Sequence, residues 1–131
     1  MAERTEQHRL VKLGDSELRL EAPEQDVRGL DVYDRDGREI GSVDDLFVDT
    51  EERKVCFLDV GAGAFLGVGE KHFMIPVEAV TDVDGDAVII DQGRQKVIDS
   101  PALPTNVVPE VDYQRGVYVY YGYEYPAGTR G

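Results

Sequence analysis

The sequence predicts an all-β domain, and three observations indicate it. Residues 32–60 read as three short strands joined by two polar turns. From residue 27 to about residue 100, apolar segments follow one another at short, regular spacing, with Gly, Asp and Pro at the joints. This pattern is typical of a small barrel or sandwich. At 131 residues, the chain is also long enough to bury one core of ordinary size.

The predicted domain organisation has three parts. Residues 1–26 form a polar N-terminal arm or weak hairpin, in which apolar residues flank a Gly14-Asp15 pair. Residues 27–100 form the β-domain itself. Residues 101–131 form a C-terminal extension that is rich in Pro and Tyr.

Two turns and a bulged strand are predicted in the first half of the β-domain. Asp36-Gly37 is a pair that can adopt the positive φ of a tight turn, and residues 51–53 form a second turn. The apolar residues between 40 and 47 are also spaced as on one face of a helix. One glycine and two acids make a poor helix there, so we predict a strand with a bulge near Gly41-Ser42.

The strands that follow are predicted from alternation and from turn residues. In residues 54–60, Cys56 and Leu58 lie on one face and Phe57 lies on the other. Because the Phe57 face is also partly apolar, we expect another element to cover it. Asp84-Gly85 is predicted to be the hairpin turn between two further short strands.

Charge and composition exclude several classes of function. The formal net charge is −13 and the sequence pI is about 4.4, which argues against direct nucleic-acid binding and against anionic lipid. The single cysteine, Cys56, excludes an internal disulfide and suits a reducing cytoplasm. No apolar stretch approaches the roughly 20 residues that span a bilayer. We therefore expect a cytoplasmic protein without membrane insertion.

Short motifs across residues 27–92 carry a family resemblance through their order. They are Val32, Asp34, Gly37, Ile40, Gly41 and Val43, then Asp44-Asp45, the apolar strand 54–60, the glycine-rich loop 61–71, and Ile75-Pro76-Val77-Glu78-Ala79-Val80. In this order they resemble the PRC-barrel family. That family includes the cytoplasmic part of the photosynthetic reaction-centre H subunit, the C-terminal half of a ribosome-maturation factor and many stand-alone bacterial and archaeal proteins. The resemblance implies a small PRC-type β-barrel without a catalytic role, here with an N-terminal arm and a C-terminal extension.

No catalytic, cofactor-binding or metal-binding residue is predicted. Asp82, Asp84 and Asp86 alternate as cation ligands do, but the spacing lacks the glycine and glutamate positions of a calcium loop, so a turn is favoured. His72 has no second His or Cys at the spacing of metal ligands. It is predicted to lie at the surface or at a strand edge.

The glycine-rich loop is predicted to be a crossover rather than a phosphate site. It has neither a phosphate-loop nor a dinucleotide-binding motif. Its glycines allow a bent loop that carries Phe65 and Leu66, and such a loop is a candidate contact surface.

The C-terminal extension is predicted to dock as an extended strand. Six of the seven tyrosines lie between residues 113 and 125, and their alternation would place rings on both faces of a strand. This strand would add to a barrel edge or pack on the Phe57 face, within its own subunit or by exchange across a dimer. A disordered tyrosine-rich tail is the alternative.

The sequence therefore predicts a non-catalytic protein-interaction module, a homo-oligomeric scaffold or regulatory protein, most simply a homodimer. Two alternatives are an assembly factor that binds a basic ribosomal protein through charge complementarity and a small-ligand binder that uses loop 61–71. The candidate interaction residues are Phe57, Phe65, Leu66, Tyr118, Tyr120, Tyr121, Tyr123 and Tyr125. The predicted structural turn residues are Gly37, Gly41, Gly61, Gly67, Pro76 and Gly85.

Overall fold

A single sheet of seven strands dominates the computed structural model, which describes residues 9–62, 71–101, 103 and 108–125. The strands are β1 (Leu10–Lys12), β2 (Asp31–Tyr33), β3 (Glu39–Asp49), β4 (Val55–Ala62), β5 (Lys71–Pro76), β6 (Val80–Asp84) and β7 (Ala87–Ile90). Their order is β5-β4-β3-β2-β7-β6, and β1 pairs with β3. Among the described residues the sheet is open, with β5 and β6 at its two ends.

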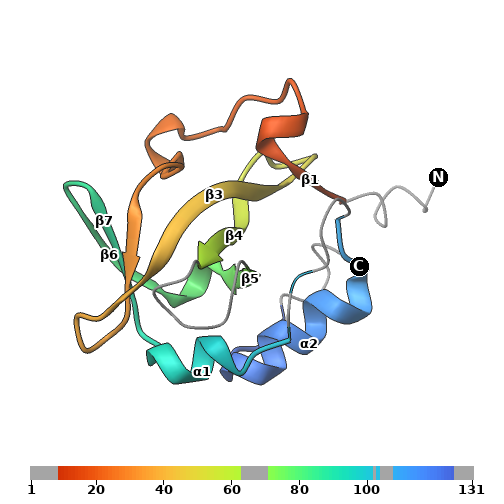
Figure 1. Cartoon of the computed structure of the whole chain (residues 1–131). Coiled ribbons are helices and arrows are strands. Elements are labelled where there is room, and N and C mark those ends of the chain that lie inside the picture. Colours follow the sequence, from red (N-terminus) through yellow and green to blue (C-terminus); the bar gives the residue numbers. More distant parts are fainter. Residues whose placement is uncertain (1–8, 63–70, 102, 104–107, 126–131) are drawn as a thin grey trace.

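The prediction of an all-β fold is correct for the sheet but misses two helices. These are α1 (Arg94–Ile98) and α2 (Val111–Tyr121), and they lie together along one side of the sheet (Figure 1). Three short 3-10 turns, Leu13–Asp15, Pro23–Gln25 and Val77–Ala79, complete the described elements. Within this part of the chain, neither helix has the length and apolarity needed to cross a membrane.

The strand predicted between residues 40 and 47 is confirmed, and it is irregular as expected. Val32 of β2 pairs with Gly41, whereas Tyr33 pairs with Glu39, so β3 carries one extra residue beside the predicted position. A Cβ atom added to Gly41 would lie 2.1 Å from the carbonyl oxygen of Gly61 on β4. The backbones of β3 and β4 approach so closely here that a side chain at position 41 is excluded.

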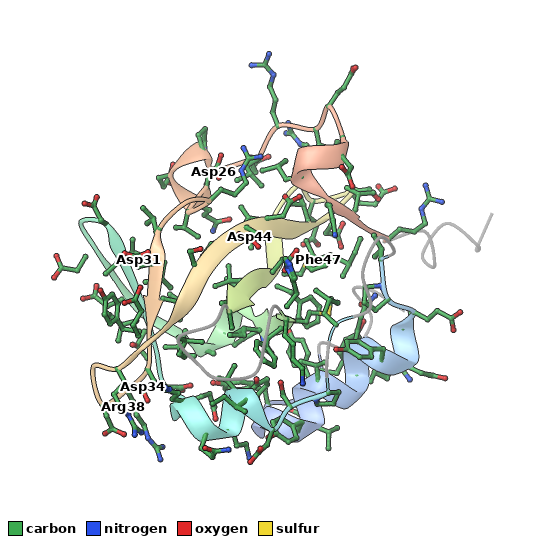
Figure 2. All side chains as sticks on the ribbon, in the orientation of Figure 1. Asp26, Asp31, Asp34, Arg38, Asp44 and Phe47 are labelled. Atoms are coloured by element: carbon green, nitrogen blue, oxygen red, sulfur yellow. The ribbon has the colours of Figure 1, made fainter. Side chains whose placement is uncertain are left out.

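The turn between β2 and β3 is held by Asp34, which also binds the start of α1. Its carboxylate accepts hydrogen bonds from the backbone N–H groups of Asp36 and Arg38 at 2.9 and 2.8 Å. It accepts a third from the N–H of Arg94, at 2.8 Å. Figure 2 labels Asp34 and Arg38 beside this turn, next to α1. Asp34 is fully buried and joins two segments that are far apart in the sequence.

Gly37 occupies the left-handed position of the same turn, with a φ of 83°. We expect Gly37→Val to destabilise the protein by about 1–2 kcal/mol, because a β-branched residue is strained at positive φ. An added Cβ meets no atom within 4 Å, so the cost arises from the backbone and not from a clash. Thermal unfolding followed by circular dichroism measures the effect. Gly37→Asn is the control and should lose clearly less, while a Val variant as stable as the parent would contradict the turn assignment.

The core lies on both faces of β4. Cys56, Leu58 and Val60 point to one face, and Phe57 points to the other. As expected from the sequence, another element covers the Phe57 face: the ring of Tyr118 on α2 meets the ring of Phe57 edge-on, with centroids 5.4 Å apart. Both side chains are fully buried.

The predicted extended strand in the C-terminal extension is wrong, because these residues form helix α2. Its buried side chains are Gln114, Val117, Tyr118 and Tyr121, which follow the i, i+3, i+4, i+7 spacing of a helix face. The helix ends in a Schellman motif, in which the N–H of Tyr123 bonds the carbonyl of Tyr118. The extension packs on its own subunit, so the disordered alternative is also wrong for residues 111–125.

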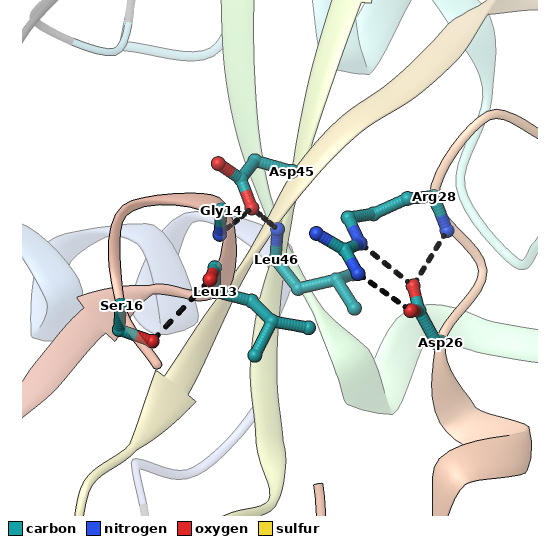
Figure 3. Close-up of polar contacts among 7 residues, drawn as sticks. All are labelled: Leu13, Gly14, Ser16, Asp26, Arg28, Asp45 and Leu46. Atoms are coloured by element: carbon teal, nitrogen blue, oxygen red, sulfur yellow. Dashed lines mark hydrogen bonds and ion pairs between the residues drawn. The ribbon is translucent and has the colours of Figure 1, made fainter. Parts of the chain in front are cut away.

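The described part of the N-terminal arm, from residue 9 onward, does not form a hairpin. β1 pairs with the end of β3, Leu10 opposite Asp49, instead of pairing with the segment around Leu18. The backbone N–H of Gly14 donates to Asp45 Oδ1 at 2.9 Å, and Arg28 forms a two-point ion pair with Asp26 (Figure 3). The hydrogen bond from Arg28 holds the pKa of Asp26 below its ordinary value.

Candidate functional site

Two features of the described surface that could bind another molecule include residues of β4. One is a cluster of Lys12, Asp44, Asp59 and His72, here called the polar cluster. The other is an apolar pocket beside β6. They differ in chemistry and are described in turn.

Three neighbouring strands bring the polar cluster together. Gly61 of β4 pairs with His72 of β5, and Asp59 lies two residues before Gly61, on the same face of the strand. Asp44 lies on β3, where the pairing with β4 shifts its register between Val43 and Asp45. Gly61 has no side chain, so the Asp44 carboxylate can lie against β4. A Cβ atom added to Gly61 would stand 2.3 Å from Asp44 Oδ2.

The polar cluster is densely charged and partly buried. His72 Nδ1 lies 2.7 Å from Asp59 Oδ1 and 3.5 Å from Asp44 Oδ2. Lys12 Nζ lies 3.9 Å from the other oxygen of Asp59. The exposed fractions of the side chains are 4% for Asp59, 27% for His72 and 46% for Asp44. Burial raises the pKa of Asp59, although the hydrogen bond and charge of His72 and the charge of Lys12 act in the opposite direction.

Sequence reasoning did not find this cluster. His72 was expected at the surface or at a strand edge; it lies on β5, an end strand of the described sheet, and is partly buried against Asp59. The missed signal is Asp59 itself, because it interrupts an otherwise apolar strand. A buried carboxylate needs a hydrogen-bond or ion-pair partner. Because Asp59 lies on β4, this partner is expected on one of the two neighbouring strands.

The apolar pocket lies on the face of β4 that carries Leu58. Its volume is about 280 Å³. The lining residues come from the 3-10 turns Pro23–Gln25 and Val77–Ala79, from the loop after the first of these turns, and from β4, β6 and β7: Glu24, Gln25, Val27, Val55, Leu58, Val77, Val80, Val83 and Val88. Six valines and a leucine make its wall mainly aliphatic, and Val83 in this wall is 47% exposed.

Acidic side chains lie on the hairpin that supplies part of the pocket wall. Asp82, Asp84 and Asp86 are all exposed on the β6–β7 hairpin, and Glu24 belongs to the pocket wall. Residues 77–93 contain no Lys or Arg. The hairpin turns at Gly85, as the sequence predicted, and in Figure 1 it extends away from the helices. The three aspartates therefore lie at or beside an exposed hairpin turn.

The predicted turn residues are not all found in turns. Gly85 lies in the hairpin turn, and Pro76 ends β5 just before the 3-10 turn Val77–Ala79. Gly61, expected to open the glycine-rich loop, instead lies inside β4 and pairs with both neighbouring strands. Phe65, Leu66 and Gly67 lie outside the described residues.

Most of the predicted interaction tyrosines contact their own subunit. Tyr118 and Tyr121 are buried in the core together with Phe57, so none of these three rings faces a partner. Tyr120 donates to the carbonyl of Lys96 at 2.6 Å, and Tyr123 donates to Asp91 at 2.5 Å. Tyr125 packs on Tyr118 and donates to Gln114.

Burial raises the pKa of Tyr113 and of Tyr123 to about 12. Both phenols therefore stay protonated near neutral pH and act as hydrogen-bond donors. The rings of the extension hold α2 on the sheet.

Comparison with known proteins gives one finding about the family. The family model described as PRC-barrel domain matches residues 24–97. This stretch contains β2 to β7, α1 except its last residue, the polar cluster except Lys12, and the whole lining of the apolar pocket. No curated protein matches the chain.

Proposed function

Because this chain belongs to the PRC-barrel family, we propose that it is a non-catalytic protein-interaction module whose partner inserts an apolar side chain of a basic segment into the apolar pocket. The observation that carries the proposal is the aliphatic pocket beside the acidic β6–β7 hairpin, at one end of the open sheet.

The size of the pocket fits side chains better than a free ligand. Pockets for drug-sized molecules measure roughly 300–1,000 Å³. A volume of about 280 Å³ lies just below that range and accommodates one or two aliphatic or aromatic side chains. Anchors of this kind are typical of protein interfaces.

The β6 edge supplies a second contact. Among the described residues β6 pairs only with β7, so its other edge is available to an added strand. A peptide that pairs with β6 would place alternate side chains toward Val80 and Val83 in the pocket wall. Strand addition would then give affinity, and the pocket would give specificity.

Charge favours a basic partner over a second copy of the chain at this edge. Two β6 strands paired antiparallel would bring the aspartates at 82 and 84 close to those of the other copy, and like charges opposite each other destabilise a sheet. A segment with Lys or Arg is attracted instead. A basic ribosomal protein has this chemistry, which keeps the assembly-factor alternative within the proposal. The homodimer expected from the sequence would need another surface, and light scattering against the chain mass of 14.6 kDa measures it.

Val83→Asp should remove capture of basic proteins from an extract of the native host, with ribosomal fractions included. The substitution places a charge at the pocket wall, and we expect at least about a tenfold loss, or about 1.4 kcal/mol. Quantitative mass spectrometry of immobilised parent and variant measures it. Val119→Asp on α2 is the matched control, because Val119 is 74% exposed and lies away from the pocket. Captured basic proteins should also dissociate at high salt. Equal capture by Val83→Asp and the parent would exclude this site.

A further inference from the structure

We propose that Asp44, Asp59 and His72 bind a divalent transition metal, with Zn²⁺ as the best match. The donor set is one imidazole nitrogen and two carboxylate oxygens, and their donor atoms all lie within 4.8 Å of one another. Imidazole favours Zn²⁺ and its transition-metal neighbours over Mg²⁺ and Ca²⁺, which prefer oxygen ligands only. The site is independent of the apolar pocket and of the partner proposed there.

The distances suit a zinc ion with little movement of the backbone. Ligands about 2.0 Å from a tetrahedral Zn²⁺ stand about 3.3 Å apart. His72 Nδ1 and Asp44 Oδ2 are 3.5 Å apart, close to this spacing. His72 Nδ1 and Asp59 Oδ1 are 2.7 Å apart, the length of the hydrogen bond between them. The metal would replace the proton of that hydrogen bond, and small side-chain rotations would separate the two atoms.

Three adjacent strands hold the three ligands, and the solvent exposure of the ligand side chains increases from Asp59 to His72 to Asp44. Asp59 on β4 is almost fully buried, His72 on β5 is 27% exposed, and Asp44 on β3 is 46% exposed. An ion can therefore arrive from the Asp44 side and keep a water molecule as its fourth ligand, the arrangement of zinc sites with three protein ligands. Bound metal would tie β3, β4 and β5 together on the face of β4 that also carries Phe57.

Local charge explains both the attraction and its limit. The carboxylates of Asp44 and Asp59 both lie beside His72. The ammonium group of Lys12 also lies near Asp59. Lys12 approaches Asp59 Oδ2, whereas His72 lies on Oδ1, so the metal and the ammonium group would share one carboxylate from opposite oxygens. The ammonium charge lowers the affinity for a cation. Lys12→Met should therefore strengthen zinc binding.

The test is calorimetric titration of the full chain with ZnCl₂ after chelator treatment and dialysis. We expect one saturable site, a higher melting temperature with Zn²⁺, and no such response to Mg²⁺ or Ca²⁺. Removing groups that only orient a ligand costs 10–100-fold in affinity, so His72→Gln and Asp59→Asn should each cost about 100-fold or more. His8→Gln removes the other histidine of the chain and should leave the affinity unchanged. Asp82→Asn is the control for exposed acids.

A spectroscopic measurement on the parent keeps the test independent of whether the variants fold. Zinc should shift the ¹⁵N resonance of His72 Nδ1, and Co²⁺ in its place should produce visible d–d absorption bands. The proposal is overturned by the absence of a saturable zinc site in the parent, by unchanged zinc affinity in a folded His72→Gln variant, or by zinc binding that leaves the His72 Nδ1 resonance in place.

Discussion

Asp34→Ala should melt roughly 10 °C or more below the parent, with a loss of about 3–4 kcal/mol in the free energy of unfolding. The carboxylate accepts the backbone N–H groups of Asp36, Arg38 and Arg94, and it pairs with the Arg38 side chain at 3.3 Å. Hydrogen bonds to a charged group contribute about 1.5–3 kcal/mol each. The substitution would release both the β2–β3 turn and the start of α1.

The pH dependence of Asp34 follows from its hydrogen bonds. Burial alone would raise the pKa of this carboxyl group, but the N–H groups of Arg38, Arg94 and Asp36 together hold it below the ordinary value of 3.8. A group whose pKa is lower in the folded state stabilises the fold above its unfolded pKa. The stability difference between the parent and Asp34→Asn should be constant from pH 7 to about pH 5 and should shrink as the pH falls below about 4.

The control for Asp34 lies in the same turn. Asp36 is exposed, and the ion pair described for it joins its Oδ2 atom to the Arg38 guanidinium at 3.4 Å. Asp36→Asn should change the free energy of unfolding by less than about 0.5 kcal/mol. Urea unfolding at several pH values measures all three proteins. If Asp34→Ala and Asp36→Asn were equally stable, the hydrogen-bond network would not hold the two segments together.

Strands and turns could be predicted because their signals are local. In Asp36-Gly37 and Asp84-Gly85 a glycine with positive φ stands beside a short apolar run. The composition of β3 is unfavourable for a helix, so the strand is preferred there. The role of Asp34 could not be found in the same way. The motif identifies the residue, but its bond to Arg94 joins positions 60 residues apart and exists only once the sheet has formed.

Helix α2 shows why one pattern can support two interpretations. Tyr and Val both favour strands and together fill seven of the nine positions from 117 to 125, so alternation is satisfied whichever face is inside. The helical signal was present in the spacing of Gln114, Val117, Tyr118 and Tyr121 and in the glycine at 122. The prediction that this segment packs on Phe57 is confirmed, because it depends on the apolar face of β4 and not on the conformation of the segment.

The polar cluster marks another limit of sequence reasoning. Its ligands are separated by 13 to 28 positions and belong to three strands, so no spacing rule connects them. Only the register of β3, β4 and β5 places them together. The apolar pocket has the same origin, because its wall combines residues of β4 with residues of β6 and β7, which are separated from β4 in the sheet by β3 and β2.

Tyr118→Ala should destabilise the protein by about 3–5 kcal/mol, the range for removing a large buried ring. Tyr118 is fully buried, packs edge-on against Phe57 and Tyr125, and donates to Glu78 Oε1 at 2.6 Å. Tyr118→Phe keeps the ring and loses only the hydroxyl group, so it should cost about 1 kcal/mol. Val119→Ala, on the exposed side of the same helix, should stay within about 0.5 kcal/mol of the parent.

Truncation after Val111 extends the same argument from one ring to the whole helix. Without α2 the Phe57 face of β4 is open to water, so the truncated chain should melt below every point variant and bind a hydrophobic dye. Its mass by light scattering should rise through association of the uncovered faces, because the helix docks within its own subunit. A truncated chain that kept the melting curve of the parent, or Tyr118→Ala that melted together with Val119→Ala, would show that α2 does not support the core.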